Sequence, residues 1–269
     1  MQKRLLECGF LDSKNSMKKR LQTIVLVHGS WHGGWCWIRV QKLLTDKGYE
    51  VFSPTLSGMK IKNDPEAKES GLHKHINQIV ELINLNQLES VILVGHSYAG
   101  LVITGVMHRI PERIKKVVYL DAFLPDHDQS LFDISLPERV MAIKNSLTDD
   151  EGKTLEQGAK NVWLVPVRPA ESFGVINPID MKWLTDNMVP TPIKTFEEKV
   201  SANNPKTASI PKYYIRCLEC SILEKSEEKA KKLGYHMFSI EAGHDAMITA
   251  PEETSNILVE ISEANEALE

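Results

Sequence analysis

The ten residues from Val91 to Gly100 read V-I-L-V-G-H-S-Y-A-G. Four apolar residues in a row predict a short strand that is buried on both faces of a parallel sheet. A turn of small residues follows, and a helix is expected from Ala99 onward. A sharp turn between a buried strand and a helix is the setting of a nucleophile elbow, which would present Ser97 above the sheet. The usual elbow pattern, G-x-S-x-G, has glycine at the place of Ala99, and alanine is small enough to fit there.

Other short apolar runs flank this segment and alternate with helical patterns. Further strands are expected at residues 24–27, 49–52, 117–120, 213–217 and 236–240. Helices are expected at residues 35–44, 73–85, 99–110, 221–233 and 251–268. Such an alternation predicts an α/β fold with a mostly parallel sheet flanked by helices.

The alternation stops between residues 125 and 210, a stretch with many prolines and scattered aromatic residues. We expect a helical cap here, inserted after the strand that ends at Leu120. It would lie over the carboxyl edge of the sheet, where open α/β sheets bind their ligands. The core then consists of residues 22–124 and 211–269, and residues 1–21, which show no clear period, form a loose N-terminal extension.

The composition is that of a globular protein. The chain has 269 residues, of which 42% are hydrophobic and 25% charged, so it can bury a sizeable core. Its net charge of −4 argues against a nucleic-acid partner. No stretch reaches the roughly 20 apolar residues of a membrane span, and acidic residues interrupt the start where a signal peptide would be apolar. We therefore expect a cytoplasmic protein without a membrane partner, either a monomer or a homodimer.

Four cysteines are far too few for a disulfide scaffold in a chain of this length. Cys217 and Cys220 form a C-x-x-C motif, but the motif follows an apolar strand instead of opening a helix. No second C-x-x-C or paired histidine completes a zinc site. We therefore expect no metal.

A glycine-rich loop, H-G-S-W-H-G-G-W-C-W at residues 28–37, directly follows the first predicted strand. In proteins with a nucleophile elbow, one oxyanion donor comes from the residue after the nucleophile and another from an early loop of this kind. The N–H groups of Tyr98 and Ser30 are accordingly the predicted oxyanion hole.

Glycine and aromatic side chains suggest how a substrate would be held. Gly29 lets the backbone of the loop approach a substrate closely. Aromatic residues of the cap suggest an apolar acyl or alcohol group. The predicted substrate-binding residues are Gly29, Trp31, Trp163 and Phe173.

His244 is the expected general base. It lies in E-A-G-H-D-A-M-I-T-A-P, residues 241–251, directly after the last predicted strand. Of the nine histidines, only His244 combines a loop at a strand end with a position after Ser97 in the chain. In enzymes with a nucleophile elbow, the catalytic histidine follows the nucleophile in the sequence.

Four motifs together resemble the α/β-hydrolase superfamily over nearly the whole chain from residue 22. They are H-G-S-W-H-G-G-W-C-W, G-H-S-Y-A-G, Y-L-D-A-F-L-P and G-H-D-A-M-I-T-A-P. They are similar to a branch that contains small bacterial esterases, plant methylesterases and hydroxynitrile lyases. The resemblance implies a cofactor-free serine esterase that forms an acyl-enzyme on Ser97. Its substrate would be a small apolar ester, a methyl ester or a lactone such as a macrolide.

The resemblance also identifies an irregularity in the acid of the triad. The family's usual acid follows the strand at 213–217, where this chain has Cys220 preceded by Glu219. A neutral thiol cannot stabilise an imidazolium as a carboxylate does. We prefer Asp121 as the acid, because some members of the superfamily resemble this chain in placing it after the strand at 117–120. Glu219 is the alternative.

Other functions on the same fold stay open. The missing acid at Cys220 makes a non-catalytic, ligand-binding member of the fold the main alternative. The hydroxynitrile lyases have threonine after the first histidine of the loop and lysine after the catalytic histidine. This chain has Gly29 and Asp245 there, and an aspartate would repel departing cyanide. A haloalkane dehalogenase would need a carboxylate in place of Ser97.

Overall fold

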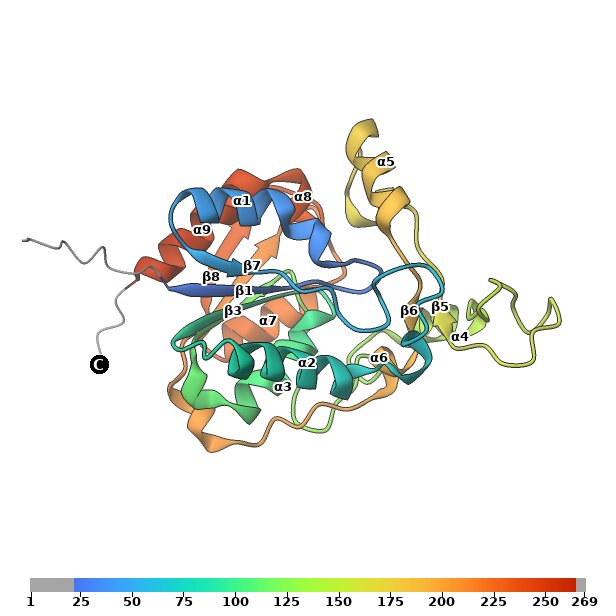
Figure 1. The fold of residues 1–269 in the computed structure, drawn as a ribbon, viewed down its shortest axis with the longest axis horizontal. Helices are drawn as coiled ribbons and strands as arrows, with labels where there is room; N and C mark the ends of the chain where they lie inside the picture. The colour runs from blue at the N-terminus through green and yellow to red at the C-terminus, as the bar shows by residue number, and fades with distance from the viewer. Residues whose placement is uncertain (1–21, 265–269) are drawn as a thin grey trace, which may run out of the picture.

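A computed structural model describes residues 22–264, which fold around one six-stranded parallel sheet (Figure 1). The strand order is β2-β1-β3-β4-β7-β8, and every neighbouring pair is parallel. The strands are β1 (Thr23–Val27), β2 (Glu50–Phe52), β3 (Val91–His96), β4 (Ile114–Leu120), β7 (Lys212–Cys217) and β8 (His236–Ile240). The expected α/β architecture is confirmed. The predicted N-terminal extension, residues 1–21, lies outside the described residues.

Helices cover both faces of the sheet. Figure 1 shows α1, α8 and α9 on one face and α2 and α3 on the other, while α7 packs against β7 and β8. Their bounds are α1 (Ile38–Asp46), α2 (Leu72–Leu85), α3 (Ala99–Arg109), α7 (Glu224–Lys232), α8 (Ala246–Thr249) and α9 (Pro251–Glu263). All residues of β1 and β3 are buried, because layers on both sides remove these central strands from water.

The register of the strands brings the candidate site together. Val27 of β1 pairs with Gly95 of β3, and His96 of β3 pairs with Leu120 of β4. Leu120 also pairs with Ile215 of β7. Because the strands are parallel, their carboxyl ends meet at one edge of the sheet, and the loops that follow them become neighbours.

Residues between β4 and β7 form a separate group of short elements. They are α4 (Pro137–Asn145), β5 (Leu164–Val165), α5 (Pro178–Asn187), β6 (Thr191–Pro192) and α6 (Lys194–Glu197). Figure 1 shows α4, β5 and β6 together at one end of the molecule. The sequence predicts helices alone here, whereas β5 and β6 pair as a small antiparallel sheet. Strands of two residues, one of them containing Pro192, are too short to produce a hydrophobic period.

Contacts to the core hold this inserted group in place. The backbone N–H of Trp31 donates to Thr191 Oγ1 at 2.7 Å. On the other side, Arg39 of α1 forms an ion pair with Asp180 of α5, with 2.5 Å between Nη2 and Oδ1. Because Trp31 belongs to the glycine-rich loop, the insertion is anchored directly beside the candidate site.

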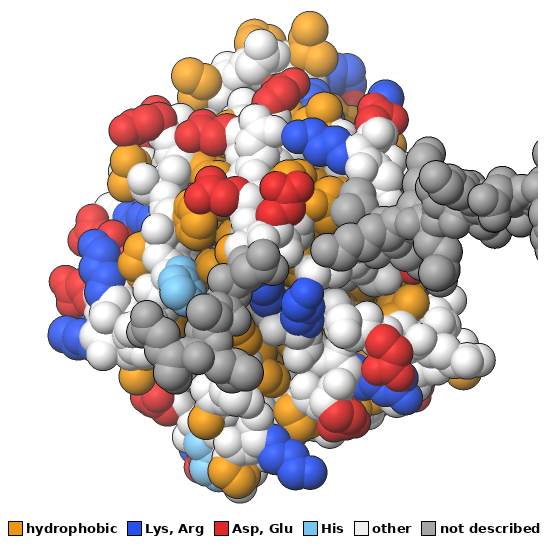
Figure 2. Space-filling view, turned by 90° about the vertical axis from the view of Figure 1, so that its left-hand side faces the viewer, with side chains coloured by type: hydrophobic (Ala, Val, Ile, Leu, Met, Phe, Trp, Pro, Cys, Tyr) orange, Lys and Arg blue, Asp and Glu red, His pale blue; other side chains and the backbone are white. Residues whose placement is uncertain are grey.

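The surface at the end of the molecule away from α4, β5 and β6 carries mixed charge. Figure 2 shows lysine, arginine, aspartate and glutamate side chains interspersed on this face, with no broad area of one sign. Across residues 22–264, no helix has the length and the apolar character required to cross a membrane.

Candidate active site

Ser97 lies in a tight turn between β3 and α3. Its φ angle is +56°, in the left-handed region that non-glycine residues rarely adopt. The carbonyl oxygen of Ser97 accepts hydrogen bonds from the N–H groups of Gly100 and Phe123, each at 3.1 Å. A Cβ atom on Gly100 would lie 2.0 Å from the carbonyl oxygen of Phe123. The turn therefore requires glycine at residue 100 and accepts alanine at residue 99.

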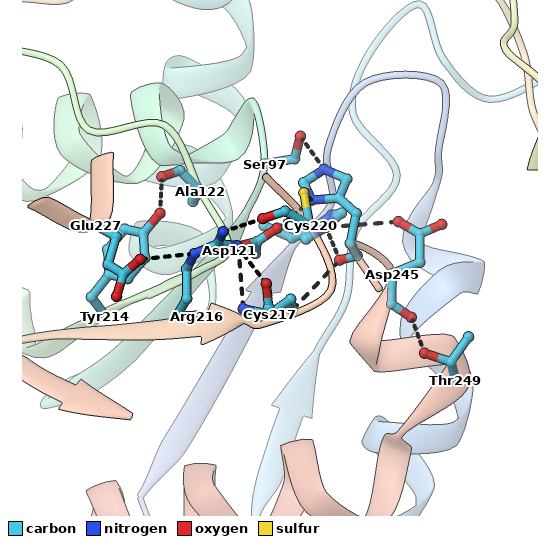
Figure 3. Close-up of polar contacts among 12 residues, drawn as sticks. Ser97, Asp121, Ala122, Tyr214, Arg216, Cys217, Cys220, Glu227, Asp245 and Thr249 are labelled. Atoms are coloured by element: carbon cyan, nitrogen blue, oxygen red, sulfur yellow. Dashed lines mark hydrogen bonds and ion pairs between the residues drawn. The ribbon is translucent and has the colours of Figure 1, made fainter. Parts of the chain in front are cut away.

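His244 lies within hydrogen-bonding distance of this serine, which Figure 3 labels above Asp121 and Cys220. Its Nε2 atom is 2.9 Å from Ser97 Oγ. The carbonyl oxygen of His244 is 3.0 Å from His96 Nε2, which must be the protonated nitrogen because a carbonyl only accepts. Burial lowers the pKa of His96 to about 3, so this histidine is neutral. Its Nε2–H group donates a hydrogen bond that holds the backbone of the His244 loop.

Asp121 faces the other ring nitrogen of His244. Its Oδ2 atom lies 2.7 Å from His244 Nδ1, and the carboxylate is fully buried. The second oxygen, Oδ1, accepts hydrogen bonds from Arg216 Nη1 at 2.8 Å and from the N–H of Cys217 at 3.3 Å. Burial alone would raise the pKa of Asp121, but the hydrogen bond to His244 and the charges of His244 and Arg216 outweigh it and lower the pKa.

Cys220 and Glu219 do not take the place of this carboxylate. The sulfur of Cys220 is 3.9 Å from His244 Nδ1, a longer contact than that of Asp121. Glu219 is exposed, and its N–H donates to the carbonyl of Ala242 at 3.1 Å. The geometry therefore favours Asp121 as the partner of His244.

The environment of His244 stabilises its charged form. Burial on its own lowers the pKa of His244, but the hydrogen bond and the negative charge of Asp121 more than compensate and raise it above the ordinary value. Such a raised pKa means that the protein stabilises an imidazolium at this position. A proton removed from Ser97 Oγ would be accepted there.

Two backbone N–H groups lie beside Ser97 and have no acceptor within residues 22–264. They belong to Ser30, in the glycine-rich loop, and to Tyr98, at the N-terminus of α3. A Cβ atom on Gly29 would lie 2.8 Å from Ser97 Cβ and 3.1 Å from His96 Nδ1. Only glycine at residue 29 lets the loop lie this close, so the two N–H groups are available to a developing oxyanion.

A second buried cluster, which the sequence analysis missed, ties the glycine-rich loop to the loop of the histidine. His32 Nε2 lies 2.9 Å from Asp245 Oδ2, and His32 Nδ1 lies 2.7 Å from the carbonyl oxygen of Ser30. The contact fixes the peptide of Ser30 relative to the residue after His244. A second histidine in the loop and an aspartate after His244 were the available signals.

Ligand atoms of Asp121, Cys220 and His244 lie within 4.8 Å of one another, a spacing that a metal ion could bridge. The Asp121 carboxylate is however already paired with the guanidinium of Arg216. A fixed positive charge on the same carboxylate opposes binding of a cation. These residues fit a proton relay better than a metal centre.

A cavity of about 690 Å³ lies near Ser97, although Ser97, Asp121 and His244 are not among the described residues of its lining. Trp31 and Phe123 of the core line one part of it. The insertion contributes residues of α4 and the stretch from Val165 to Pro169. The loop after Cys220 contributes Ser221. Trp31 directly follows Ser30, and Phe123 donates its N–H to Ser97. The cavity is therefore within one residue of the Ser97 turn and has the size of a small-molecule site.

The predicted substrate-binding residues are not all at this cavity. Trp31 lines it, whereas Trp163 and Phe173 are not among the described residues of its lining. Phe173 instead packs between the loops, with its ring centroid 6.3 Å from that of His244 and 5.7 Å from that of Trp31. Gly29 lies against Ser97, as described above. Trp163 is partly buried within the insertion, where its N–H donates to the carbonyl of Thr148 at 2.9 Å.

Comparisons with known proteins agree on one family. Residues 24–256 match the model of the alpha/beta hydrolase family. The chain is 32% identical to a carbendazim hydrolyzing esterase of a Nocardioides species, over 88% of this chain and 98% of the relative. It is 24% identical to methylesterase 10 of Arabidopsis thaliana, over 94% and 96% of the two chains. The fold is also that of an extracellular alpha/beta-hydrolase from a Paenibacillus species, with a TM-score of 0.77 at 23% identity, covering 90% of this chain and all of the other.

Proposed function

The chain belongs to the alpha/beta hydrolase family, and we propose that it is a serine esterase with Ser97 as nucleophile, His244 as general base and Asp121 as acid. One observation carries this assignment. The ring of His244 lies between Ser97 Oγ, at 2.9 Å, and Asp121 Oδ2, at 2.7 Å. This is the arrangement in which a carboxylate orients an imidazole that activates a serine.

In the proposed reaction, His244 accepts the proton of Ser97 while Oγ attacks the ester carbonyl. The N–H groups of Ser30 and Tyr98 donate to the oxyanion that develops. His244 then returns its proton to the departing alcohol, which leaves an acyl-enzyme on Ser97. Water, deprotonated by His244, attacks this intermediate, and His244 returns the proton to Ser97 Oγ as the carboxylic acid leaves.

Esters of small alcohols are the proposed substrates. The curated relatives include enzymes named as a carbendazim hydrolyzing esterase and as methylesterases, which supports a small leaving group. If the alcohol that departs is as small as methanol, the cavity of about 690 Å³ is available for the acyl part of the substrate. Cleavage of a lactone stays a prediction.

The proposal also includes a cytoplasmic location. Cys36, Cys217 and Cys220 are free and buried, and burial raises the pKa of the Cys36 and Cys217 thiols. Unpaired thiols of this kind are typical of proteins in a reducing compartment.

Hydrolysis of p-nitrophenyl acetate and butyrate by the wild type and by Ser97→Ala tests the activity. We expect Ser97→Ala to lose at least about a thousand-fold in kcat/KM. Ser209→Ala, which changes an exposed serine away from the site, is the matched control and should retain full activity. Equal turnover by the wild type and Ser97→Ala would contradict the assignment of the nucleophile.

A fluorophosphonate probe separates an esterase from a ligand-binding protein without depending on the choice of ester. The probe should add its mass to the wild type and to Ser209→Ala, but not to Ser97→Ala, because it reacts with an activated serine. A wild type that neither reacts with the probe nor hydrolyses esters, yet is stabilised by them, would indicate ligand binding without catalysis.

A further inference from the structure

One wall of the cavity carries an arginine that forms no ion pair with any residue between 22 and 264. Arg139 lies in α4 and lines the cavity next to Phe123. Its Nε and Nη1 atoms are buried from solvent, and neither donates a hydrogen bond to any residue between 22 and 264. An arginine offers five donors, and buried donors without acceptors are costly, so such a group indicates a missing partner.

Packing holds this guanidinium in place. Its central carbon lies 5.5 Å from the centroid of the Phe123 ring, within the range of a cation–π contact. The N–H of Phe123 donates to the carbonyl of Ser97 at 3.1 Å. Arg139 is therefore connected through one residue to the nucleophile elbow, with the cavity in front of it.

The other charged groups around the cavity do not neutralise Arg139. Arg168 and Lys225 add positive charge to the lining, while Glu138 and Glu224 add negative charge. Both glutamates are exposed, and neither forms an ion pair with Arg139 among the described residues. Burial and the neighbouring charge of Arg168 lower the pKa of Arg139 to about 10, so it remains a cation at neutral pH.

We propose that Arg139 binds a free carboxylate on the acyl part of the substrate, so that the enzyme prefers half-esters of dicarboxylic acids. This inference rests on the proposed esterase function and adds the substrate class. A carboxylate in the cavity would accept a hydrogen bond from Nη2, the nitrogen of Arg139 that is not buried, and would neutralise the charge of the guanidinium. The apolar lining beside it, such as Val165 and Ile143, would contact the carbon chain between the two acyl groups.

The test compares monomethyl esters of dicarboxylic acids of increasing length with the matched dimethyl esters, which lack the charge. For each pair we take the ratio of kcat/KM for the half-ester to that for the diester. The wild type should favour the half-ester at one chain length, where the ester reaches Ser97 while the carboxylate reaches Arg139. In Arg139→Gln this ratio should fall at least about tenfold, mainly through KM, and Arg139→Lys should recover part of it.

Arg109→Gln is the matched control, because it removes an equal charge at the exposed end of α3, outside the cavity lining. Its ratio should equal that of the wild type. The inference is overturned if Arg139→Gln lowers the rates on half-ester and diester equally, or if the wild type shows no preference for half-esters at any length.

A binding measurement keeps this result separate from the esterase proposal. Monomethyl esters should raise the melting temperature of Ser97→Ala, and adding Arg139→Gln to this variant should remove the shift. Stabilisation that depends on Arg139 in a protein without Ser97-dependent turnover would overturn the esterase function and retain the carboxylate site. Turnover that depends on Ser97 but is unaffected by Arg139→Gln would retain the esterase function and overturn the carboxylate site.

Discussion

The Oδ1 atom of Asp121 lies 2.8 Å from Nη1 of Arg216, on the side of the carboxylate turned away from His244. Figure 3 shows this pair together with the contact from Arg216 to Glu227, which has 3.0 Å between Nε and Oε2. The arginine therefore fixes one oxygen of Asp121 and leaves the other free for the histidine. The φ angle of Asp121, +38°, lies in the strained left-handed region, so the side chain is held by its surroundings and not by a relaxed turn.

The identity of the acid is tested by Asp121→Asn against Glu219→Gln. An amide at residue 121 keeps the shape but cannot stabilise the imidazolium of His244, so kcat should fall by about four orders of magnitude. Glu219 is exposed, and its replacement should change kcat less than about twofold. Steady-state hydrolysis of p-nitrophenyl butyrate measures both. A large loss in Glu219→Gln with an active Asp121→Asn would reverse the assignment.

The pH dependence of kcat/KM reports the charge of His244. The base must be neutral to accept a proton, and Asp121 raises its pKa, so activity should rise with pH through a midpoint above the ordinary histidine value of about 6.5. In Asp121→Asn the midpoint of this rise should shift to lower pH. The reason is that the negative charge that stabilises the imidazolium of His244 is gone. A midpoint that is the same in both proteins would contradict the coupling.

Removing Arg216 should lower the stability of the folded protein. Arg216→Gln leaves the buried Asp121 carboxylate without its permanently charged partner, a change that typically costs about 3–5 kcal/mol in the free energy of unfolding. Urea unfolding measures this loss. Lys231→Gln, which removes an exposed partner of Glu227, is the control and should cost less than about 1 kcal/mol. Equal stabilities of the two variants would show that the Arg216 pair contributes nothing.

The close approach of the glycine-rich loop to the elbow is tested by Gly29→Ala. The new methyl group would lie 2.8 Å from Ser97 Cβ and would displace the N–H of Ser30, so kcat should fall by about a hundred-fold. Gly152→Ala is the control, because Gly152 has no atom within 4 Å of such a methyl group. The control should lose some stability, since its φ angle is +78°, but keep its kcat. A fully active Gly29→Ala would remove Ser30 from the proposed oxyanion hole.

The sequence predicted the sheet well because buried parallel strands are short continuous apolar runs. The strand expected at 236–240 is β8 without change, and the others differ at their ends. β4 begins at Ile114 and not at residue 117. The two lysines Lys115 and Lys116 interrupt the apolar run near the start of this strand, so the run alone does not reveal where the strand begins. Lys116 is buried there, with its ammonium group donating to the carbonyl of Ile261 at 2.6 Å, a contact that no local pattern reveals.

The candidate site was predictable where its residues follow strands and unpredictable where they meet across the fold. Ser97, Asp121 and His244 each follow a strand, and the parallel sheet brings those ends together. Spacing alone could not decide between Asp121 and Glu219, because the choice depends on which carboxylate faces one ring nitrogen. Arg216 was missed although a charged residue inside the apolar run of β7 was a signal of a buried ion pair.

With the proposed acid on β4, the loop after β7 no longer has to supply a carboxylate to the relay. Ser221 and Ile222 of this loop line the cavity and are exposed. Substitutions at these two positions can therefore change the shape of the cavity while the charges around His244 stay as they are. We expect mutant libraries restricted to residues 221 and 222 to change the relative kcat/KM values for different esters, while the pH dependence that His244 sets stays the same.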